Sequence, residues 1–344
     1  MKIAPFMWEM ERRSGVEVYL VHTGQHYDER MSKLFFEELH IPQPDIDLGV
    51  GSASHAVQTA EVMKRFEPVV LEQLPDAVVV VGDVNSSIAC ALTAVKLDVP
   101  VAHIEAGLRS FDRSMPEEIN RVLTDAISQW LFVSERSGIE NLRREGVSEQ
   151  RMFFVGNIMI DTLLACRDRA QQSPILDELG LRKNEYAVVT LHRPANVDDS
   201  TVFAGLLQAL GEIQRQIPIV FPVHPRTRKA LDNERIAAMP NLKLTEPLSY
   251  LDFMKLMAEA RLVLTDSGGI QEETTVLGVS CLTLRNNTER PATVAEGTNT
   301  LVGLSPSRIV EAARQSLRRP TYKPSVPELW DGQAAKRIAD VLLS

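Results

Sequence analysis

Short apolar segments alternate with helical patterns along the whole chain, and this alternation constrains the fold most. Segment 77–81, AVVVV, lacks the polar–apolar alternation of a half-exposed strand, as is typical of strands covered on both faces. The repeated strand–helix order predicts parallel sheets with helices on both faces, the doubly wound α/β class. The predicted strands form two series, 17–21, 77–81, 99–104, 130–133 and 153–155, then 187–191, 219–222, 242–245, 262–265 and 281–284.

The two series of strands indicate two domains, as expected for 344 residues at about 150 residues per domain. The polar stretch Gln-Gln-Ser-Pro at 171–174 suits an interdomain connection. We predict two Rossmann-like domains facing a cleft, over residues 1–165 and 166–330. The amphipathic helix in the closing segment 331–344 is expected to pack back on the first domain.

The beginning of the chain departs from this pattern. A doubly wound domain normally opens with a strand that lies in the middle of its sheet. This chain opens on a helical pattern that places Ile3, Met7 and Met10 on one face. The first strand of the first domain is therefore missing from the pattern.

Composition argues against several classes of protein. A net charge of −9 disfavours nucleic-acid binding, which rewards basic surfaces. No apolar run approaches the roughly 18 residues of a transmembrane helix. Cys90, Cys166 and Cys281 lie far apart in apolar segments, so we interpret them as buried hydrophobes and not as zinc ligands or a disulfide framework. We predict a cytoplasmic protein without a nucleic-acid partner, a membrane partner or a metal.

Three carboxylates follow predicted strands of the first domain, at the edge where open α/β sheets bind ligands. Asp83 follows 77–81, Glu105 follows 99–104, and Glu117 opens the next helix. Neighbouring carboxylates raise one another's pKa towards neutrality, which suits proton transfer. The cluster predicts an acid/base site.

Each of these residues also has a structural interpretation. Asp83 could cap the following helix. Ser114 and Glu117 match a capping box, and Glu117 could form a helix ion pair with Arg121. His103 lies within a predicted strand and is interpreted as a packed core histidine.

In the second domain, Ser267-Gly268-Gly269 separates a strand from a helix. Small residues at a helix N-terminus let backbone N–H groups approach a phosphate. Glu272 and Glu273 follow, where one carboxylate can accept hydrogen bonds from ribose hydroxyls. The alternative is a glycine turn whose acidic residues complement the helix dipole.

Two His/Arg pairs also follow strands of the second domain. His192-Arg193 and His224-Pro-Arg226 suit a diphosphate, since both side chains donate hydrogen bonds. GxxxxGK[ST] and GxSxG are absent, and GVGSAS at 49–54 lacks the third glycine of a dinucleotide fingerprint.

Nine segments together resemble the non-hydrolysing UDP-N-acetylglucosamine 2-epimerase family. They occur in family order over nearly the whole chain: GQHYDE, GDVNSS, HIEAGLRS, MPEEINR, VGNIMID, LHRPAN, PVHPRT, LTDSGGIQEE and TERPATVAEGT. The resemblance implies the GT-B architecture, a UDP-sugar substrate, a homodimer and no cofactor. The implied reaction is anti elimination of UDP to a 2-acetamidoglucal, followed by re-addition with C2 inverted.

The same resemblance assigns the site residues. Asp83, Glu105 and Glu117 match the family's acid/base carboxylates, and His192 matches its histidine near the diphosphate, although Leu191 stands where glycine is usual. With the strand-end residues, the predicted substrate-binding set is Lys2, Arg121, His224, Ser267, Gly268, Gly269, Glu273 and Arg290.

Two departures from the family pattern lead to further expectations. The opening strand and its GTRPE motif have no counterpart, so we expect the native start to lie upstream of Met1; otherwise the chain would be an inactive UDP-binding paralogue. Gln25 and His26 of the family's regulatory loop remain, but Asp28 and Glu61 occupy the other two positions. Carboxylates there would repel a diphosphate, which predicts weak or absent allosteric activation.

Two other activities are compatible with the motifs. A 2-epimerase of a related UDP-sugar, such as a UDP-diacetamido uronic acid, would share every segment named. A GT-B glycosyltransferase would share the architecture and would need an acceptor.

Overall fold

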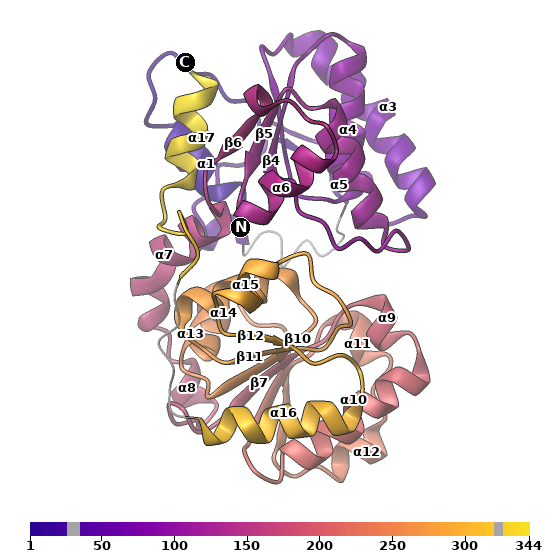
Figure 1. The fold of residues 1–344 in the computed structure, drawn as a ribbon, viewed down its shortest axis with the longest axis vertical. Helices are drawn as coiled ribbons and strands as arrows, with labels where there is room; N and C mark the ends of the chain where they lie inside the picture. The colour runs from indigo at the N-terminus through magenta and orange to yellow at the C-terminus, as the bar shows by residue number, and fades with distance from the viewer. Residues whose placement is uncertain (26–34, 320–325) are drawn as a thin grey trace. The chain divides into compact units, whose positions relative to one another are not determined.

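The computed structural model describes residues 1–25, 35–319 and 326–344. The chain divides into two compact units (Figure 1). Unit 1 comprises Met1–Thr162 and Glu328–Ser344, and unit 2 comprises Leu163–Pro327. Each unit is an α/β domain with its own parallel sheet.

Unit 1 contains a four-stranded parallel sheet in the order β3-β4-β5-β6. A separate two-stranded parallel sheet pairs β1 with β2. The strands are β1 (Val21–His22), β2 (Ile46–Asp47), β3 (Val78–Val81), β4 (Val101–Ala106), β5 (Trp130–Val133) and β6 (Met152–Phe154). The helical elements are α1 (Ala4–Met10), α3 (His55–Gln73), α4 (Asn85–Lys96), α5 (Pro116–Ile127), α6 (Arg136–Arg144), the 3₁₀ turn η1 (Glu149–Arg151), α7 (Ile158–Gln171), which continues into unit 2, and α17 (Ala334–Leu342).

Alternate strand residues of unit 1 enter two different cores, because successive side chains of a strand point to opposite faces. Val78 and Val80 pack with α3 and α4 on one face. Val79 and Val81 pack on the other face, with α1 and α17. The closing helix α17 thus lies beside α1 over the unit 1 sheet (Figure 1).

Unit 2 contains a six-stranded parallel sheet in the order β12-β11-β10-β7-β8-β9. The strands are β7 (Ala187–Thr190), β8 (Ile219–Pro222), β9 (Leu242–Thr245), β10 (Leu262–Thr265), β11 (Cys281–Thr283) and β12 (Asn299–Leu301). The helices are α8 (Ile175–Glu178), α9 (Pro194–Val197), α10 (Ser200–Ile213), α11 (Pro225–Arg228), α12 (Asn233–Ala237), α13 (Tyr250–Ala258), α14 (Gly268–Leu277), α15 (Pro291–Ala295) and α16 (Pro306–Arg318).

Helices cover both faces of the unit 2 sheet, α10 and α16 on one and α8, α13 and α14 on the other (Figure 1). The strand order reverses between β7 and β10, which are paired at the centre. In open α/β sheets this switch point opens a crevice at the carboxyl ends of the strands. The segments that follow β7 and β10 carry His192 and Ser267, so both predicted site residues lie at the switch point.

Most strand predictions are confirmed, with three differences. The predicted strand 17–21 is reduced to β1, because its partner β2 is only two residues long. β2 and β12 were not predicted, since Ile46–Asp47 and Asn299–Leu301 lack an apolar run. The three cysteines are buried, as predicted.

Candidate active site

Asp83 lies directly after β3, in a turn held against β4. The N–H of Gly82 donates to the carbonyl of Ile104 at 3.0 Å. Helix α4 has Val84 as its N-cap, so the capping interpretation of Asp83 is wrong. Its carboxylate instead forms an ion pair with the Arg121 guanidinium of α5. Asp83 is thereby fixed at the strand end with part of its surface exposed.

Glu105 occupies an irregular position inside β4. Its φ is +79°, in the left-handed region that non-glycine residues rarely adopt. The β4–β5 register shifts between Ile104 and Ala106, which marks a bulge. The buried carboxylate forms an ion pair with the Lys2 ammonium. Such strain is often retained where it aims a side chain at a functional site, which is consistent with the predicted role of Glu105.

Lys2 and Arg121 therefore each meet one of the strand-end carboxylates. The Lys2 ammonium also lies close to the other turn, 3.3 Å from where a Cβ on Gly82 would be. An opposite charge nearby favours the ionised carboxylate. The arrangement brings Lys2, Asp83, Glu105 and Arg121 into one cluster in which each carboxylate is paired with a cation.

Glu118 is a buried residue that the sequence analysis missed. Its carboxylate accepts hydrogen bonds from the N–H and hydroxyl of Ser110 and from the N–H of Phe111, each at 2.9 Å. It also forms an ion pair with Arg121. Burial alone would raise the pKa of Glu118, but these bonds and Arg121 hold it below its usual value. Glu118 thus anchors the loop after β4 and holds the Arg121 guanidinium that faces Asp83. Its i,i+3 spacing from Arg121 is the one sequence pattern that could have predicted this ion pair.

Glu117 lies next to Glu118 in the sequence but, unlike Glu118, does not anchor the structure. The N-cap of α5 is Met115, and the Ser114 hydroxyl donates to Asp112 at 2.6 Å, so the capping-box interpretation is wrong. Within the part of the chain that the structure describes, the half-buried Glu117 carboxylate makes no hydrogen bond or ion pair. The structure therefore leaves Glu117 available to a ligand without joining it to Asp83 or Glu105.

In unit 2, Asp266 orients His192. Asp266 is fully buried, and its carboxylate accepts the N–H groups of His192 and Arg193 and lies 2.9 Å from Nδ1 of His192. Burial would raise the pKa of Asp266, but His192 and the backbone donors lower it. An ionised carboxylate only accepts, so His192 carries hydrogen on Nδ1. The ring is 43% exposed at its side chain and is directed outward by a fixed partner.

His224 lies beside His192, with ring centroids 6.0 Å apart. His224 is the N-cap of α11, and its Nδ1 accepts the N–H of Arg226 at 3.2 Å. Accepting there leaves Nε2 as its donor nitrogen. The two predicted histidines are therefore brought together by the ends of neighbouring strands β7 and β8.

The N-terminus of α14 follows β10 directly. Ser267 is the N-cap, and its own N–H donates to the Thr265 hydroxyl at 3.0 Å. A Cβ on Gly268 would lie 2.7 Å from the Glu289 carboxylate, so a side chain there would displace that carboxylate. Ser267, Gly268 and Gly269 remain partly exposed. The predicted phosphate position thus has the small residues and the helix end that the sequence indicated.

Glu273 lies one turn further along α14 and is 2% exposed. Its carboxylate accepts the Tyr250 hydroxyl at 3.0 Å. Burial raises the pKa of Glu273 to about 7, although Tyr250 acts in the opposite direction. A group with this pKa changes charge in the neutral range, which bears on any ligand that needs the carboxylate.

Arg290 is buried, and its Nε lies 2.6 Å from the Glu272 carboxylate. A neighbouring carboxylate, Glu289, lies 2.6 Å from Arg285 and 3.5 Å from Arg193. Burial would raise the pKa of Glu289, but Arg290, Arg285 and Arg193 hold it far below the usual range. The arginines of this region are therefore engaged with buried carboxylates of their own unit.

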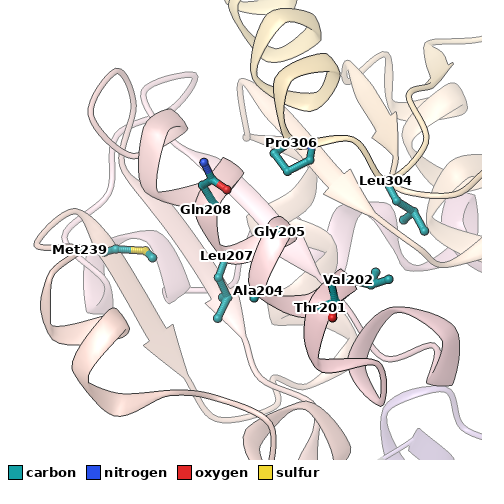
Figure 2. A pocket seen from close by; sticks show the side chains of 9 residues that line it. All are labelled: Thr201, Val202, Ala204, Gly205, Leu207, Gln208, Met239, Leu304 and Pro306. Carbon is teal, nitrogen blue, oxygen red and sulfur yellow. The ribbon is translucent and has the colours of Figure 1, made fainter.

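A cavity of about 770 Å³ lies elsewhere in unit 2 (Figure 2). It is lined by α10 together with Met239, Leu304 and Pro306, and it is mostly apolar. None of the predicted site residues lines it. The cavity is therefore separate from the strand-end chemistry.

The predicted regulatory loop is only partly described. His26 and Asp28 lie outside the described residues. Gln25 accepts the Ser86 hydroxyl at 2.6 Å, and Glu61 on α3 pairs with Arg65 at 3.1 Å. The expectation of weak allosteric activation stays a prediction.

Two further observations concern metals and membranes. Among residues 1–25, 35–319 and 326–344, no three His, Cys, Asp or Glu side chains lie close enough together to hold a metal ion. Within the same ranges no helix combines the length and apolarity needed to cross a membrane.

Two Rossmann-like units with polar residues at their strand ends define a two-domain α/β protein of GT-B-like architecture. The chain belongs to the UDP-N-acetylglucosamine 2-epimerase family, whose sequence profile matches residues 8–343. Members of this family are epimerases, so the chain is an enzyme of the isomerase class.

Individual relatives cover nearly the whole chain. A UDP-N-acetylglucosamine 2-epimerase homolog of Methanococcus maripaludis is 44% identical, over 99% of this chain and 95% of the relative. The UDP-2,3-diacetamido-2,3-dideoxy-D-glucuronate 2-epimerase of Pseudomonas aeruginosa is 43% identical, over 94% of this chain and 90% of the relative. The crystal structure of Methanocaldococcus jannaschii UDP-GlcNAc 2-epimerase with UDP-GlcNAc and UDP has a TM-score of 0.94 at 41% identity, covering 99% of this chain and 96% of that one.

Proposed function

We propose that this enzyme interconverts UDP-GlcNAc and UDP-ManNAc. Family membership and the relatives named above support the activity. The observation in this chain that carries the proposal is the pair of strand-end carboxylates, Asp83 and Glu105, each held by a cation. An ionised carboxylate at the ligand edge of the sheet can accept a proton, which is what epimerisation at an unactivated sugar carbon requires.

The proposed reaction has two balanced steps. In the first, a carboxylate of unit 1 takes the C2 proton, the C–H electrons form a C1=C2 double bond, and the C1–O bond breaks, so that UDP leaves with the bonding pair. In the second, the diphosphate oxygen attacks C1 and a carboxylic acid delivers a proton to C2 from the opposite face. Asp83, Glu105 and Glu117 are the candidates for these transfers, and no redox group is needed.

Unit 2 supplies the candidate residues for the UDP moiety. A diphosphate suits the N–H groups at the start of α14, beside Ser267 and Gly268, because a helix N-terminus favours anions. His192 presents a donor whose orientation Asp266 fixes, and such a donor stabilises charge developing on the leaving group. Glu273 is the candidate acceptor for ribose hydroxyls.

The direct test is proton NMR of UDP-GlcNAc incubated with the enzyme in deuterated water. We expect UDP-ManNAc to form and deuterium to enter C2 of both sugars, because the abstracted proton exchanges with solvent. Epimerisation with full retention of the C2 hydrogen would exclude proton abstraction at that carbon.

A second candidate substrate is a UDP-diacetamido uronic acid, favoured by the Pseudomonas aeruginosa relative named for such a sugar. Parallel kinetics on the two UDP-sugars decide between them, since a higher kcat/KM for the uronate would make it the preferred substrate. A product that forms only with an added acceptor sugar would indicate a glycosyltransferase. UDP binding without turnover of either sugar would indicate an inactive paralogue.

We also propose a homodimer. Ile119 and Leu123 are exposed one turn apart on α5, and Val57 and Leu71 are exposed on α3. Exposed apolar side chains of this size are compatible with a subunit interface. Light scattering after size exclusion should give twice the 38.3 kDa chain mass. A monomer mass at micromolar concentration would contradict the proposal.

A further inference from the structure

His103, which the sequence analysis interpreted as a packed core histidine, faces a hydrogen-bond acceptor at each ring nitrogen. It lies on β4, two residues before Glu105, and is fully buried. Its Nδ1 is 2.7 Å from the Asp125 carboxylate, and its Nε2 is 3.0 Å from the Gly82 carbonyl. A neutral imidazole has one N–H and cannot donate to both acceptors. Hydrogens on both nitrogens, as in an imidazolium, would let His103 donate to both acceptors.

The charges around His103 agree with this protonation state. Asp125 on α5 is 1% exposed, and its other oxygen lies 2.7 Å from the Arg109 guanidinium. Arg109 in turn donates to both oxygens of Glu145, at 2.8 and 2.7 Å. Glu145 is exposed, so charges of alternating sign run from the surface inward through Arg109 and Asp125 to a cationic His103. Buried charges are tolerated when they are paired in this way.

Asp125 also binds the backbone on the far side of Glu105. The N–H of Gly107 donates to it at 3.0 Å. Gly107 has φ +82°, and a Cβ there would lie 2.6 Å from the Gly138 carbonyl, so α6 confines this turn from its other side. One carboxylate therefore holds two turns: Gly107 directly, and Gly82 through His103.

These two turns carry the carboxylates of the proposed reaction. Asp83 follows Gly82 directly, and Glu105 lies between His103 and Gly107. Neither His103 nor Asp125 is exposed enough to touch a substrate. A displacement of about 1 Å in a catalytic group can cost about 10²-fold in rate, so a device that holds both strand ends has a functional consequence beyond stability.

We propose that His103, as an imidazolium paired with Asp125, is a positioning residue that holds the Gly82–Asp83 and Glu105–Gly107 turns in register for proton transfer. The inference rests on the proposed function for its kinetic consequence. The double protonation of His103 stands on geometry alone and is tested separately.

The first experiment is nitrogen-15 NMR of histidine-labelled wild-type enzyme at pH 7.5. His103→Asn identifies the His103 signals by their disappearance. We expect each of the two His103 ring nitrogens to show a one-bond coupling to hydrogen. A His103 ring nitrogen without bound hydrogen would overturn the proposal, whatever reaction the enzyme catalyses.

The second experiment compares two substitutions that each keep one of the two bonds. His103→Asn can still donate to Asp125 but loses Gly82, whereas His103→Gln reaches Gly82 but loses Asp125. We expect kcat to fall about 10²-fold in His103→Asn, with KM within about twofold of wild type because uridine recognition is unchanged. His103→Gln should recover part of the lost kcat.

The matched control is Val62→Ala, which opens a fully buried position of α3, a helix that carries neither turn. It should lower the melting temperature without changing kcat. Wild-type kcat in both His103 variants would overturn the positioning role. So would a fall in kcat of Val62→Ala as large as that of a His103 variant with the same melting temperature, because the loss of rate would then follow from the loss of stability. If a variant does not fold, the NMR measurement on wild type still decides the protonation state. If wild-type enzyme epimerises no UDP-sugar, the proposed function fails, and the same NMR measurement decides the His103 geometry on its own.

Discussion

The two units use charge at their strand ends in opposite ways. In unit 1, carboxylates at the strand ends form ion pairs with cations: Asp83 with Arg121 and Glu105 with Lys2. In unit 2, three arginines surround one buried carboxylate, Glu289. The first pattern leaves Asp83 and Lys2 about one quarter exposed at their side chains, whereas the second buries Glu289, Arg285 and Arg290 and leaves only its outer arginine, Arg193, 23% exposed. A charged residue after a strand can therefore belong to a ligand site or to the framework beneath one, and its burial and partners distinguish the two.

The largest expected effect tests whether the unit 1 carboxylates perform the chemistry. Asp83→Asn and Glu105→Gln should each lower kcat by roughly 10²–10⁴-fold, the range for loss of a general acid or base. UDP affinity, measured by calorimetry, should stay close to wild type, because the candidate uridine residues lie in unit 2. A wild-type rate in either variant would remove that carboxylate from the mechanism.

The next effect tests whether the charges of unit 2 are structural. Glu289→Gln leaves three arginines facing a neutral amide and should lower the free energy of unfolding by about 3–5 kcal/mol, as for other broken buried ion pairs. Chemical denaturation measures this change. Glu296→Gln, at an exposed position seven residues on, is the control and should be nearly neutral. Equal stability of the two variants would show that the buried cluster is not a structural element.

Adjacent glutamates allow the comparison to be repeated within unit 1. Glu118→Gln removes the anchor of Arg121 and of the Ser110–Phe111 backbone, so it should lower the free energy of unfolding by about 1–3 kcal/mol. Glu117→Gln should leave stability within about 0.5 kcal/mol, since Glu117 makes no hydrogen bond within the described residues, and should reduce kcat. Thermal melts measure the stability of both variants, and steady-state kinetics measure their kcat. If Glu117→Gln lost more stability and Glu118→Gln lost more activity, Glu117 would be the structural residue and Glu118 the catalytic one.

The smallest effect concerns pH and Glu273. If ribose hydroxyls donate to this carboxylate, only its ionised form accepts them fully. With a pKa of about 7 in the free enzyme, affinity for UDP-GlcNAc should rise about tenfold from pH 6 to pH 8. UDP-GlcNAc is the probe because its diphosphate has no ionisation in this range. The affinity of Glu273→Gln for UDP-GlcNAc should not change with pH. If the affinity of the wild-type enzyme were also independent of pH, Glu273 would not be the residue that binds the ribose.

The same raised pKa has an opposite effect on stability. The folded state binds the proton more tightly than the unfolded state, whose ordinary value is 4.5. The contribution of Glu273 to the free energy of unfolding is therefore complete below 4.5 and is lost as the pH rises through about 7. Between pH 6 and about pH 7, binding affinity should consequently rise while the free energy of unfolding falls.

Much of the fold was predictable because buried parallel strands have unmistakable patterns. The segments 130–133, 219–222, 242–245 and 262–265 coincide with β5, β8, β9 and β10. β2 and β12 were missed because they are two and three residues long and partly polar. Their pairing depends on neighbouring strands, which local periodicity does not encode.

The candidate site was predictable in its positions but not in its partners. Strand ends identified Asp83, Glu105 and His192, since ligand edges follow from topology. The sequence could not identify Glu118, Asp266 or Asp125 as the residues that hold them. These three residues meet the groups that they hold either through helix spacing or through packing between elements far apart in the chain. The left-handed backbone of Glu105 was also invisible, because nothing in HIEAG distinguishes a bulge from a regular strand.

The return of the chain to unit 1 has a consequence for how the protein is made. Asp161 on α7 accepts the N–H groups of Ala334 and Ala335 at 3.2 and 2.8 Å, which fixes the start of α17 across 173 and 174 residues of sequence. On a ribosome, all of unit 2 emerges before α17 does, so unit 2 can fold while unit 1 still exposes the apolar face that α1 and α17 share. The first half of the protein to be synthesised is therefore the last to be completed, and a chaperone that binds exposed apolar surface has its longest opportunity there.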